Sequence, residues 1–169
     1  DAQYHILEKV QEVLDRHPDE KGLIHTGSTK MAKFLASQLE EYEDRIILAF
    51  GSLRQPAFEK HMDSPDPTVL LSPSMYEGVD LKDDAARFLV IVKCPFMSLG
   101  DKQTKRRADQ DNEWYKMHAV RQIIQACGRG NRSEDDACVT YVCDAKVYET
   151  LDSMSSHIPQ WFKDAWEEE

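Results

Sequence analysis

Apolar positions along the chain follow two patterns, one with the spacing of a helix and one of short continuous runs. Within residues 3–16, Ile6, Val10 and Val13 recur every three to four residues, which predicts an amphipathic helix. Runs such as 87–94, in which Phe88 to Val92 are all apolar, are typical of strands buried on both faces. These patterns predict helices at 3–16, 29–42, 54–62, 110–127 and 146–154, and strands at 21–26, 45–50, 68–71, 87–94 and 137–143.

Strands and helices alternate from one end of the chain to the other. The alternation predicts an α/β fold with a mostly parallel sheet and helices on both faces, because parallel neighbours need crossover connections. We expect strand 45–50 to be covered on both faces and strand 87–94 to be central. The stretch 96–110 is polar, basic and turn-rich, so it is predicted as a charged connection, and 157–166 as an aromatic packing tail.

The composition is that of an ordinary globular chain, with 41% hydrophobic and 31% charged residues over 169 positions, enough for a single domain at 1–169. Apolar runs stay well below membrane-spanning length, so no membrane partner is expected. The formal net charge of −10 argues against a free-standing nucleic-acid-binding module, since such modules are usually basic, but permits a local groove. The chain starts at Asp1 and passes directly into a helical pattern, so we expect a piece of a longer protein.

The four cysteines, Cys94, Cys127, Cys138 and Cys143, form no C-x-x-C pair, and no His lies at zinc-finger spacing. A zinc or iron–sulfur site is therefore not expected, and the chain is predicted to bind no metal by itself. Reduced thiols are typical of proteins inside the cell, so an intracellular location is predicted, cytoplasmic in a prokaryote.

Polar loops directly follow three of the predicted strands, at Thr26–Ser28, at Gly51–Ser52 and at 72–80. The carboxyl ends of parallel strands share one edge of a sheet, and ligands of such sheets bind there. The last loop contains Glu77, Gly78 and Asp80, in which the glycine permits close approach of a ligand and the carboxylates can orient an arginine, a ribose hydroxyl or a metal-bound water. The alternative is a turn with a helix-capping Asp.

The segment from Gly22 to Lys30 nearly matches a phosphate-binding P-loop. The residue after its second glycine, Gly27, is Ser28 rather than the required Lys, so a P-loop is not predicted. A strand followed by a hydroxyl-rich turn fits better, and that turn can donate to a phosphate or cap the next helix.

The most specific chemistry lies in the segment 125–132. At a helix end, Arg129 and Arg132 would share one face, and each guanidinium carries a rigid fork of donors that suits phosphate oxygens. Phosphoryl transfer uses such an arginine to stabilise the charge that develops on the γ-phosphate. The alternative is a solvated basic helix end capped by Gly128 or Gly130.

The pattern Q-x-x-G-R-x-x-R at 125–132 resembles motif VI of superfamily 2 helicases, and the segment 72–81, with E-G-V-D at 77–80, resembles motif V of the DinG/XPD branch. The order and separation of the two segments also fit. The resemblance implies the second, C-terminal RecA-like domain of a DNA helicase, with ATP and Mg²⁺ shared with a first RecA-like domain that carries the P-loop. That first domain and single-stranded DNA are the implied partners, and the chain alone is expected to be inactive.

The resemblance also implies roles for individual residues. Arg132 would be the arginine finger, Arg129 a companion phosphate contact and Gln125 a positioning residue. The implied ATP contacts are Glu77, Gly78, Asp80 and Gly128, and the implied nucleic-acid contacts are Thr26, Ser28, Ser52, Ser72, Ser74, Lys105 and Arg106. In motif VI, Gly130-Asn131 stands where relatives often have an apolar pair. The position of this segment beside the carboxyl edge of the sheet is implied only by the resemblance.

Two other interpretations stay open at the level of the sequence. One is a helicase-like module that binds a partner or nucleic acid without hydrolysis, against which the intact arginine pair argues. The other is a different doubly wound nucleotide or phosphate enzyme, which would need a phosphate loop of its own. None is found in the sequence.

Overall fold

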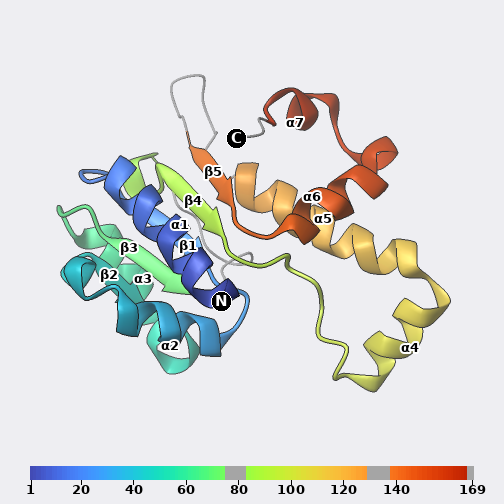
Figure 1. Ribbon diagram of the computed structural model, residues 1–169, viewed down its shortest axis with the longest axis horizontal. Coiled ribbons are helices and arrows are strands. Elements are labelled where there is room, and N and C mark those ends of the chain that lie inside the picture. The colour runs from blue at the N-terminus through green and yellow to red at the C-terminus, as the bar shows by residue number, and fades with distance from the viewer. Residues whose placement is uncertain (75–82, 129–137, 167–169) are drawn as a thin grey trace.

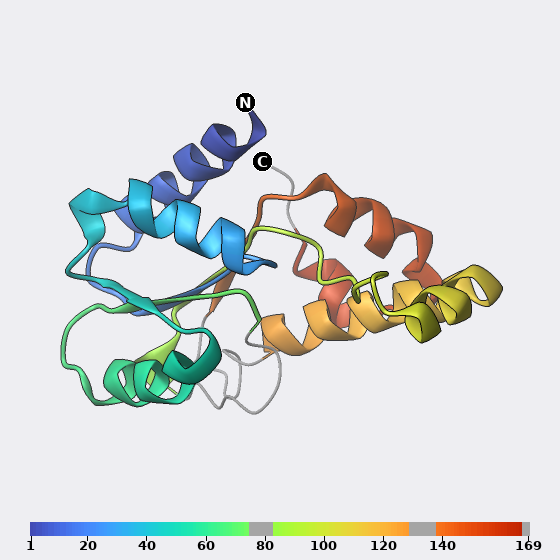
Figure 2. The same ribbon diagram turned by 90° about the horizontal axis from the view of Figure 1, so that it is seen from below.

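A computed structural model describes residues 1–74, 83–128 and 138–166. These residues form an α/β fold in which helices cover both faces of a parallel sheet (Figures 1 and 2). The helices are α1 (Ala2–Arg16), α2 (Thr29–Gln38), α3 (Arg54–Asp63), α4 (Lys102–Gln110), α5 (Asn112–Gly128), α6 (Ala145–Ser153) and α7 (Gln160–Asp164). The strands are β1 (Gly22–His25), β2 (Ile46–Leu48), β3 (Val69–Ser72), β4 (Phe88–Ile91) and β5 (Val139–Val142).

The strand order is β2-β3-β1-β4-β5, and every described pair is parallel. The register places Leu23 of β1 level with Leu70 of β3 and Leu89 of β4, in a row on one face. The next row, shifted by one residue, lies on the other face, because side chains alternate along a strand. The predicted mostly parallel sheet is therefore confirmed.

Each face of the sheet has its own hydrophobic cluster. The first face is covered by α1 and α2, whose buried residues, such as Val10 and Leu35, pack on Ile24 and Val90. The opposite face is covered by α3, α5 and α6, with Ile123 and other buried residues of these helices in one cluster with the leucine row. The sheet is thus buried on both faces, and its polar loops lie where the strands begin and end, at the amino and carboxyl edges of the sheet.

The aromatic tail packs into the second cluster. Phe162 of α7 is buried there, and Trp166 packs against the same cluster. The prediction of a packing tail is confirmed for these two residues, while Trp161 is 57% exposed.

A buried histidine joins the elements on both sides of the segment 75–82. His61 of α3 is fully buried, its Nε2 donates to the Ala85 carbonyl at 2.7 Å, and its Nδ1 accepts from the Thr68 hydroxyl at 2.7 Å. Burial is the main reason that the pKa of His61 is lowered, so the ring stays neutral. These hydrogen bonds hold Thr68, just before β3, and Ala85, shortly before β4, against α3.

The run 45–50 is covered on both faces as expected, since Ile47 packs against one hydrophobic cluster and Ile46 and Leu48 pack against the other, although β2 is an edge strand of the described sheet. Two other sequence expectations need correction. The predicted helix 29–42 ends at Gln38 and is followed by a separate 3₁₀ turn at Glu40–Tyr42. The stretch 96–110 contains a regular helix, α4, whose N-cap Asp101 accepts a hydrogen bond from the Thr104 amide at 2.8 Å.

Candidate functional site

The carboxyl ends of β3, β1 and β4 lie side by side and form the floor of a cavity of about 340 Å³. The Thr26 amide donates to the Ser72 carbonyl at 2.8 Å and the Val92 amide to the His25 carbonyl at 2.8 Å, which extends the pairing beyond the strands. The volume lies at the lower end of small-molecule pockets, about 300–1,000 Å³. The lining residues are His25, Gly27, Arg54, Pro73, Ser74, Cys94, Pro95, Phe96, Met97, His118 and Gln122.

One wall of the cavity is the segment Cys94–Met97, which leaves β4. Its first amide, of Cys94, donates at 2.8 Å to Oδ2 of Asp144, the N-cap of α6. At its other end the Tyr115 hydroxyl donates to the Met97 carbonyl at 2.8 Å, and the Phe96 and Tyr115 rings stack with centroids 5.3 Å apart and planes within 8°. Helices α5 and α6 thus hold this wall at both ends.

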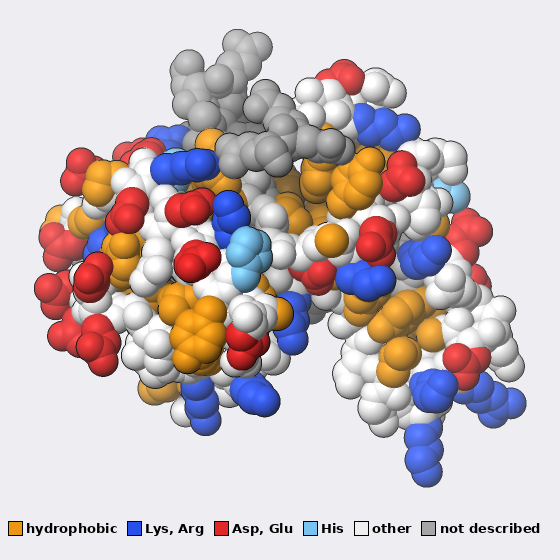
Figure 3. Space-filling model, in the orientation of Figure 1, with side chains coloured by type: hydrophobic (Ala, Val, Ile, Leu, Met, Phe, Trp, Pro, Cys, Tyr) orange, Lys and Arg blue, Asp and Glu red, His pale blue; other side chains and the backbone are white. Residues whose placement is uncertain are grey.

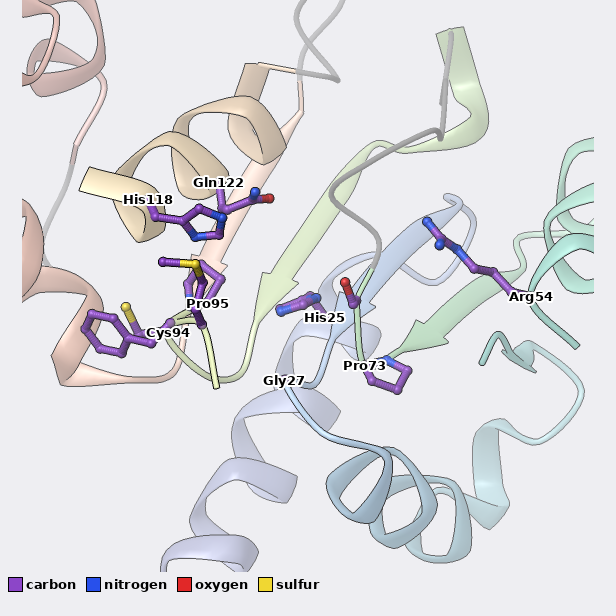
Figure 4. A pocket seen from close by; sticks show the side chains of 11 residues that line it. His25, Gly27, Arg54, Pro73, Cys94, Pro95, His118 and Gln122 are labelled. Atoms are coloured by element: carbon purple, nitrogen blue, oxygen red, sulfur yellow. The ribbon is translucent and has the colours of Figure 1, made fainter. Parts of the chain in front are cut away.

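The adjoining wall is one side of α5. His118 and Gln122 are four residues apart and therefore share a helix face. Figure 4 shows both side chains extending from α5 beside Pro95, on the side of the cavity opposite His25. Nδ1 of His118 and Oε1 of Gln122 are buried and form no hydrogen bond within the described part of the chain. Such atoms are costly in a folded protein, by about 1–3 kcal/mol each, unless a ligand or water satisfies them.

His25 and Arg54 complete the cavity. His25 is only 2% exposed, and burial lowers its pKa from 6.5 to about 3, so its imidazole is neutral at physiological pH. Arg54, the first residue of α3, lies on the far side of His25 from α5 (Figure 4). The lining therefore combines a guanidinium, two imidazoles, an amide and a serine with apolar side chains.

The lining includes no carboxylate, and the described residues hold no cluster of His, Cys, Asp or Glu that could bind a metal ion. No helix in the described ranges is long and apolar enough to cross a membrane. The cavity therefore has the donors and acceptors of a binding site.

The structure places the predicted nucleic-acid residues of the loops along this carboxyl edge. Thr26 and Ser72 are buried, and the Thr26 hydroxyl donates to the Ser28 carbonyl at 2.9 Å and the Ser72 carbonyl at 3.3 Å. These two side chains shape the edge, and their burial does not favour a direct contact with nucleic acid. Ser28 caps α2 by accepting from the Met31 amide at 3.1 Å, whereas Ser52 and Ser74 are exposed.

Lys105 and Arg106 lie elsewhere, on α4, which extends beyond the sheet and packs against the start of α5 (Figure 1). Both side chains are exposed, and Lys105 pairs with Asp109 at 3.2 Å. Figure 3 shows Lys and Arg side chains gathered over this helix at the lower right of the molecule. The carboxyl edge and α4 are therefore two separate polar surfaces.

The predicted ATP contacts fall mostly outside the described residues. Those outside are Glu77, Gly78, Asp80, Arg129 and Arg132. Gln125 is an exposed residue of α5, and Gly128 is the last residue of that helix.

The described flanks of the segment 129–137 are not at the carboxyl edge. Near the end of α5, the Cys127 thiol forms a hydrogen bond with the Thr140 side chain in the first half of β5, and the Val139 amide donates to the Arg87 carbonyl at 3.1 Å. Because β5 is parallel to its neighbours, these flanks lie at the amino edge of the sheet. The described flanks thus lie away from the carboxyl edge, and the two arginines, for which the resemblance implies a position beside that edge, lie outside the described residues.

Sequence reasoning missed most of the cavity. His25 and His118 had no visible partner in the sequence, and Gln122 belongs to no recognisable motif. Phe96 was noticed only as part of a K-x-P-F stretch, at 93–96, that the family resemblance relates to single-stranded DNA. One signal was available, since Tyr115, His118 and Gln122 recur at helical spacing. Without the strand order, nothing indicated what this helix face would meet.

Comparison with known proteins gives a family and several relatives. The helicase C-terminal domain family matches residues 2–165. Regulator of telomere elongation helicase 1 homologs are similar in sequence, with 29% identity over 100 residues in Drosophila grimshawi and 26% over 103 residues in Caenorhabditis elegans. Each match covers 52% of this chain and 10% of the relative, so the chain spans about a tenth of the length of these relatives.

Solved structures share the fold at lower identity. S. tokodaii Xpd4 aligns with a TM-score of 0.60 and 18% identity, over 93% of this chain and 32% of that one. The C-terminal domain of the DEAD-box protein Dbp5 aligns with a TM-score of 0.60 and 14% identity, over 90% of this chain and 77% of that one. The predicted RecA-like fold is therefore confirmed.

Proposed function

Because the chain belongs to the helicase C-terminal domain family of DinG/XPD-type superfamily 2 helicases, we propose that it is the second motor domain of an ATP-dependent DNA helicase. In this role Arg132 contacts the γ-phosphate of ATP that is held with Mg²⁺ by the first RecA-like domain. Arg129 is a second phosphate contact and Gln125 positions the site. Single-stranded DNA lies along the carboxyl edge of the sheet. The family match over nearly the whole chain is the observation that carries this proposal.

The geometry of the described residues supports a shared ATP site for the two motifs. The segment that contains Glu77, Gly78 and Asp80 leaves the carboxyl end of β3 and returns before β4, at the amino edge. The segment that contains Arg129 and Arg132 returns before β5, where Val139 pairs with Arg87. The returning ends of the two segments are therefore neighbours.

We therefore assign separate roles to the two edges. Ser28, Ser52 and Ser74 are at the carboxyl edge, which suits contacts with the backbone of a strand, while the ATP contacts belong to segments that return at the opposite edge. Closing of the cleft on ATP and its opening after hydrolysis would then move the strand between the two domains. With a net charge of −10 on the chain, the grip on DNA has to be local.

The test is the ATPase activity of the full-length protein with and without single-stranded DNA, comparing wild type with Arg132→Ala. We expect turnover stimulated by DNA in the wild type and a loss of roughly a thousandfold or more in the variant, because an arginine finger acts on the transition state. ATP binding should stay nearly intact. Lys9→Ala removes one exposed charge on α1, outside both motif segments, and should leave turnover unchanged.

Two outcomes would count against the proposal. Unaltered turnover in Arg132→Ala would remove the finger assignment. Absence of any turnover in the wild type, with DNA binding retained, would favour the helicase-like module that binds without hydrolysis.

A further inference from the structure

We propose that the cavity between α5 and the carboxyl ends of β1 and β3 accepts one unstacked nucleobase of the bound single strand. This inference rests on the proposed function, since it needs a strand along that edge. It goes further by assigning a base contact to residues outside the helicase motifs, with Phe96, His118 and Gln122 as the principal contacts.

The apolar part of the cavity suits a flat ring. The Tyr115 ring stacks on Phe96 at a centroid distance of 5.3 Å, and Phe96 also lines the cavity, so its remaining surface is available to a ligand. Pro95 and Met97 flank it. Bases of single strands commonly stack on such aromatic side chains, and the stacking tolerates any base because every base has a π-face. The hydrogen bonds from Cys94 and to Met97 hold this wall in place before a ligand binds.

The polar part of the cavity suits the edge of a base. Oε1 of Gln122 and Nδ1 of His118 are buried and without a hydrogen-bond partner among the described residues. A glutamine amide offers a donor and an acceptor side by side, which matches the paired donor and acceptor on a base edge. A base would therefore satisfy atoms that the fold leaves unsatisfied.

The charge of the cavity favours a base over a backbone phosphate. His25 is neutral at physiological pH, because burial lowers its pKa to about 3. Arg54 is the one Lys or Arg among the residues that line the described cavity. Phosphate sites usually combine several cationic or amide donors, whereas one guanidinium at the far side of a cavity can contact the phosphate next to an inserted base.

The experiment uses full-length protein and a labelled single-stranded DNA oligonucleotide, together with a series in which a single abasic site is moved along the strand. We expect one position at which the abasic site weakens binding by about tenfold, the typical effect of losing one stacked base. Gln122→Ala and Phe96→Leu should weaken binding of the intact oligonucleotide similarly. Both variants should bind the oligonucleotide with the abasic site at that position as the wild type does.

A control variant and two kinds of contrary outcome distinguish failure of the base assignment from failure of the proposed function. Gln38→Ala makes the same truncation as Gln122→Ala at an exposed position at the end of α2, and it should change neither affinity. Equal weakening of the intact and abasic oligonucleotides by Gln122→Ala would mean a backbone contact and would overturn the base assignment, as would the lack of any sensitive position. A wild type that binds no single strand would overturn the proposed function as well. Thermal unfolding of each variant checks that the fold is retained.

Discussion

The buried His25 should make the domain lose stability in mild acid, and the His25→Gln substitution should reduce that loss. The imidazole is 2% exposed and its pKa in the folded chain is about 3, compared with 6.5 for an ordinary histidine. Because the folded pKa is the lower one, the unfolded chain takes up this proton first as the pH falls. Stability is therefore complete above pH 6.5 and is lost between pH 6.5 and 3.

The size of the effect follows from the shift. At pH 5 the unfolded chain gains about 2 kcal/mol from protonation of this one ring, and the total reaches about 5 kcal/mol below pH 3. Domains of this kind have unfolding free energies of about 5–15 kcal/mol, so the change at pH 5 is measurable.

The assay is urea unfolding of the domain at pH 7.5 and pH 5, for wild type and His25→Gln. Many groups titrate over this range, His61 among them, so the informative quantity is the difference between the two proteins in the loss on acidification. We expect the wild type to lose about 2 kcal/mol more than His25→Gln. His5→Gln, the same change at an exposed side chain of α1, should lose as much as the wild type. Equal losses in wild type and His25→Gln would refute the reasoning.

Two further predictions concern packing and charge. Gly22→Ala should lower the unfolding free energy by about 1–3 kcal/mol or more in urea titrations, because its Cβ would overlap the ring of Phe88, which is fully buried and cannot move aside. The exposed Gly100→Ala should be nearly neutral. Equal effects of the two substitutions on the unfolding free energy would contradict this reasoning. Lys105→Ala should lower the salt dependence of single-stranded DNA binding, measured as the slope of log K against log salt, by about 0.7. Lys9→Ala, which also removes an exposed lysine paired with an acid on a helix, should not change the slope, and an unchanged slope in Lys105→Ala would remove α4 from the DNA path.

Much of the fold could be predicted from local pattern, because the buried runs and helical stripes are clear. Strand positions were correct to within a few residues, and Cys138 and Cys143, five residues apart around one strand, do face opposite clusters. The helix α4 was missed because Ala108 is its only buried residue, so it lacks a hydrophobic stripe. Its sequence did contain another signal, the N-cap Asp101 before a run of good helix formers.

The position of β2 and the cavity could not be predicted for the same reason. An apolar run does not state whether its strand lies inside a sheet or at its edge, and β2 is at the edge. The cavity combines residues from the ends of β1, β3 and β4 with residues of α3 and α5, and these meet only through the strand order β2-β3-β1-β4-β5. Motif resemblance identified the family, but it concerns 72–81 and 125–132, and so did not include His118 or Gln122.

Helix α5 connects the two proposed sites. His118 and Gln122, in the middle of α5, line the cavity at the carboxyl edge, and Gly128 at the C-terminal end of the helix directly precedes the segment with Arg129 and Arg132. Six residues separate Gln122 from Gly128, about 9 Å of helix. Val120 and Ile123 are fully buried against the sheet, so this helix is expected to move with the domain as one rigid element. A base in the cavity and ATP at the arginines would then act on the middle and on the C-terminal end of the same helix. The substitutions Gln122→Ala and Arg132→Ala therefore probe one rigid element at two places.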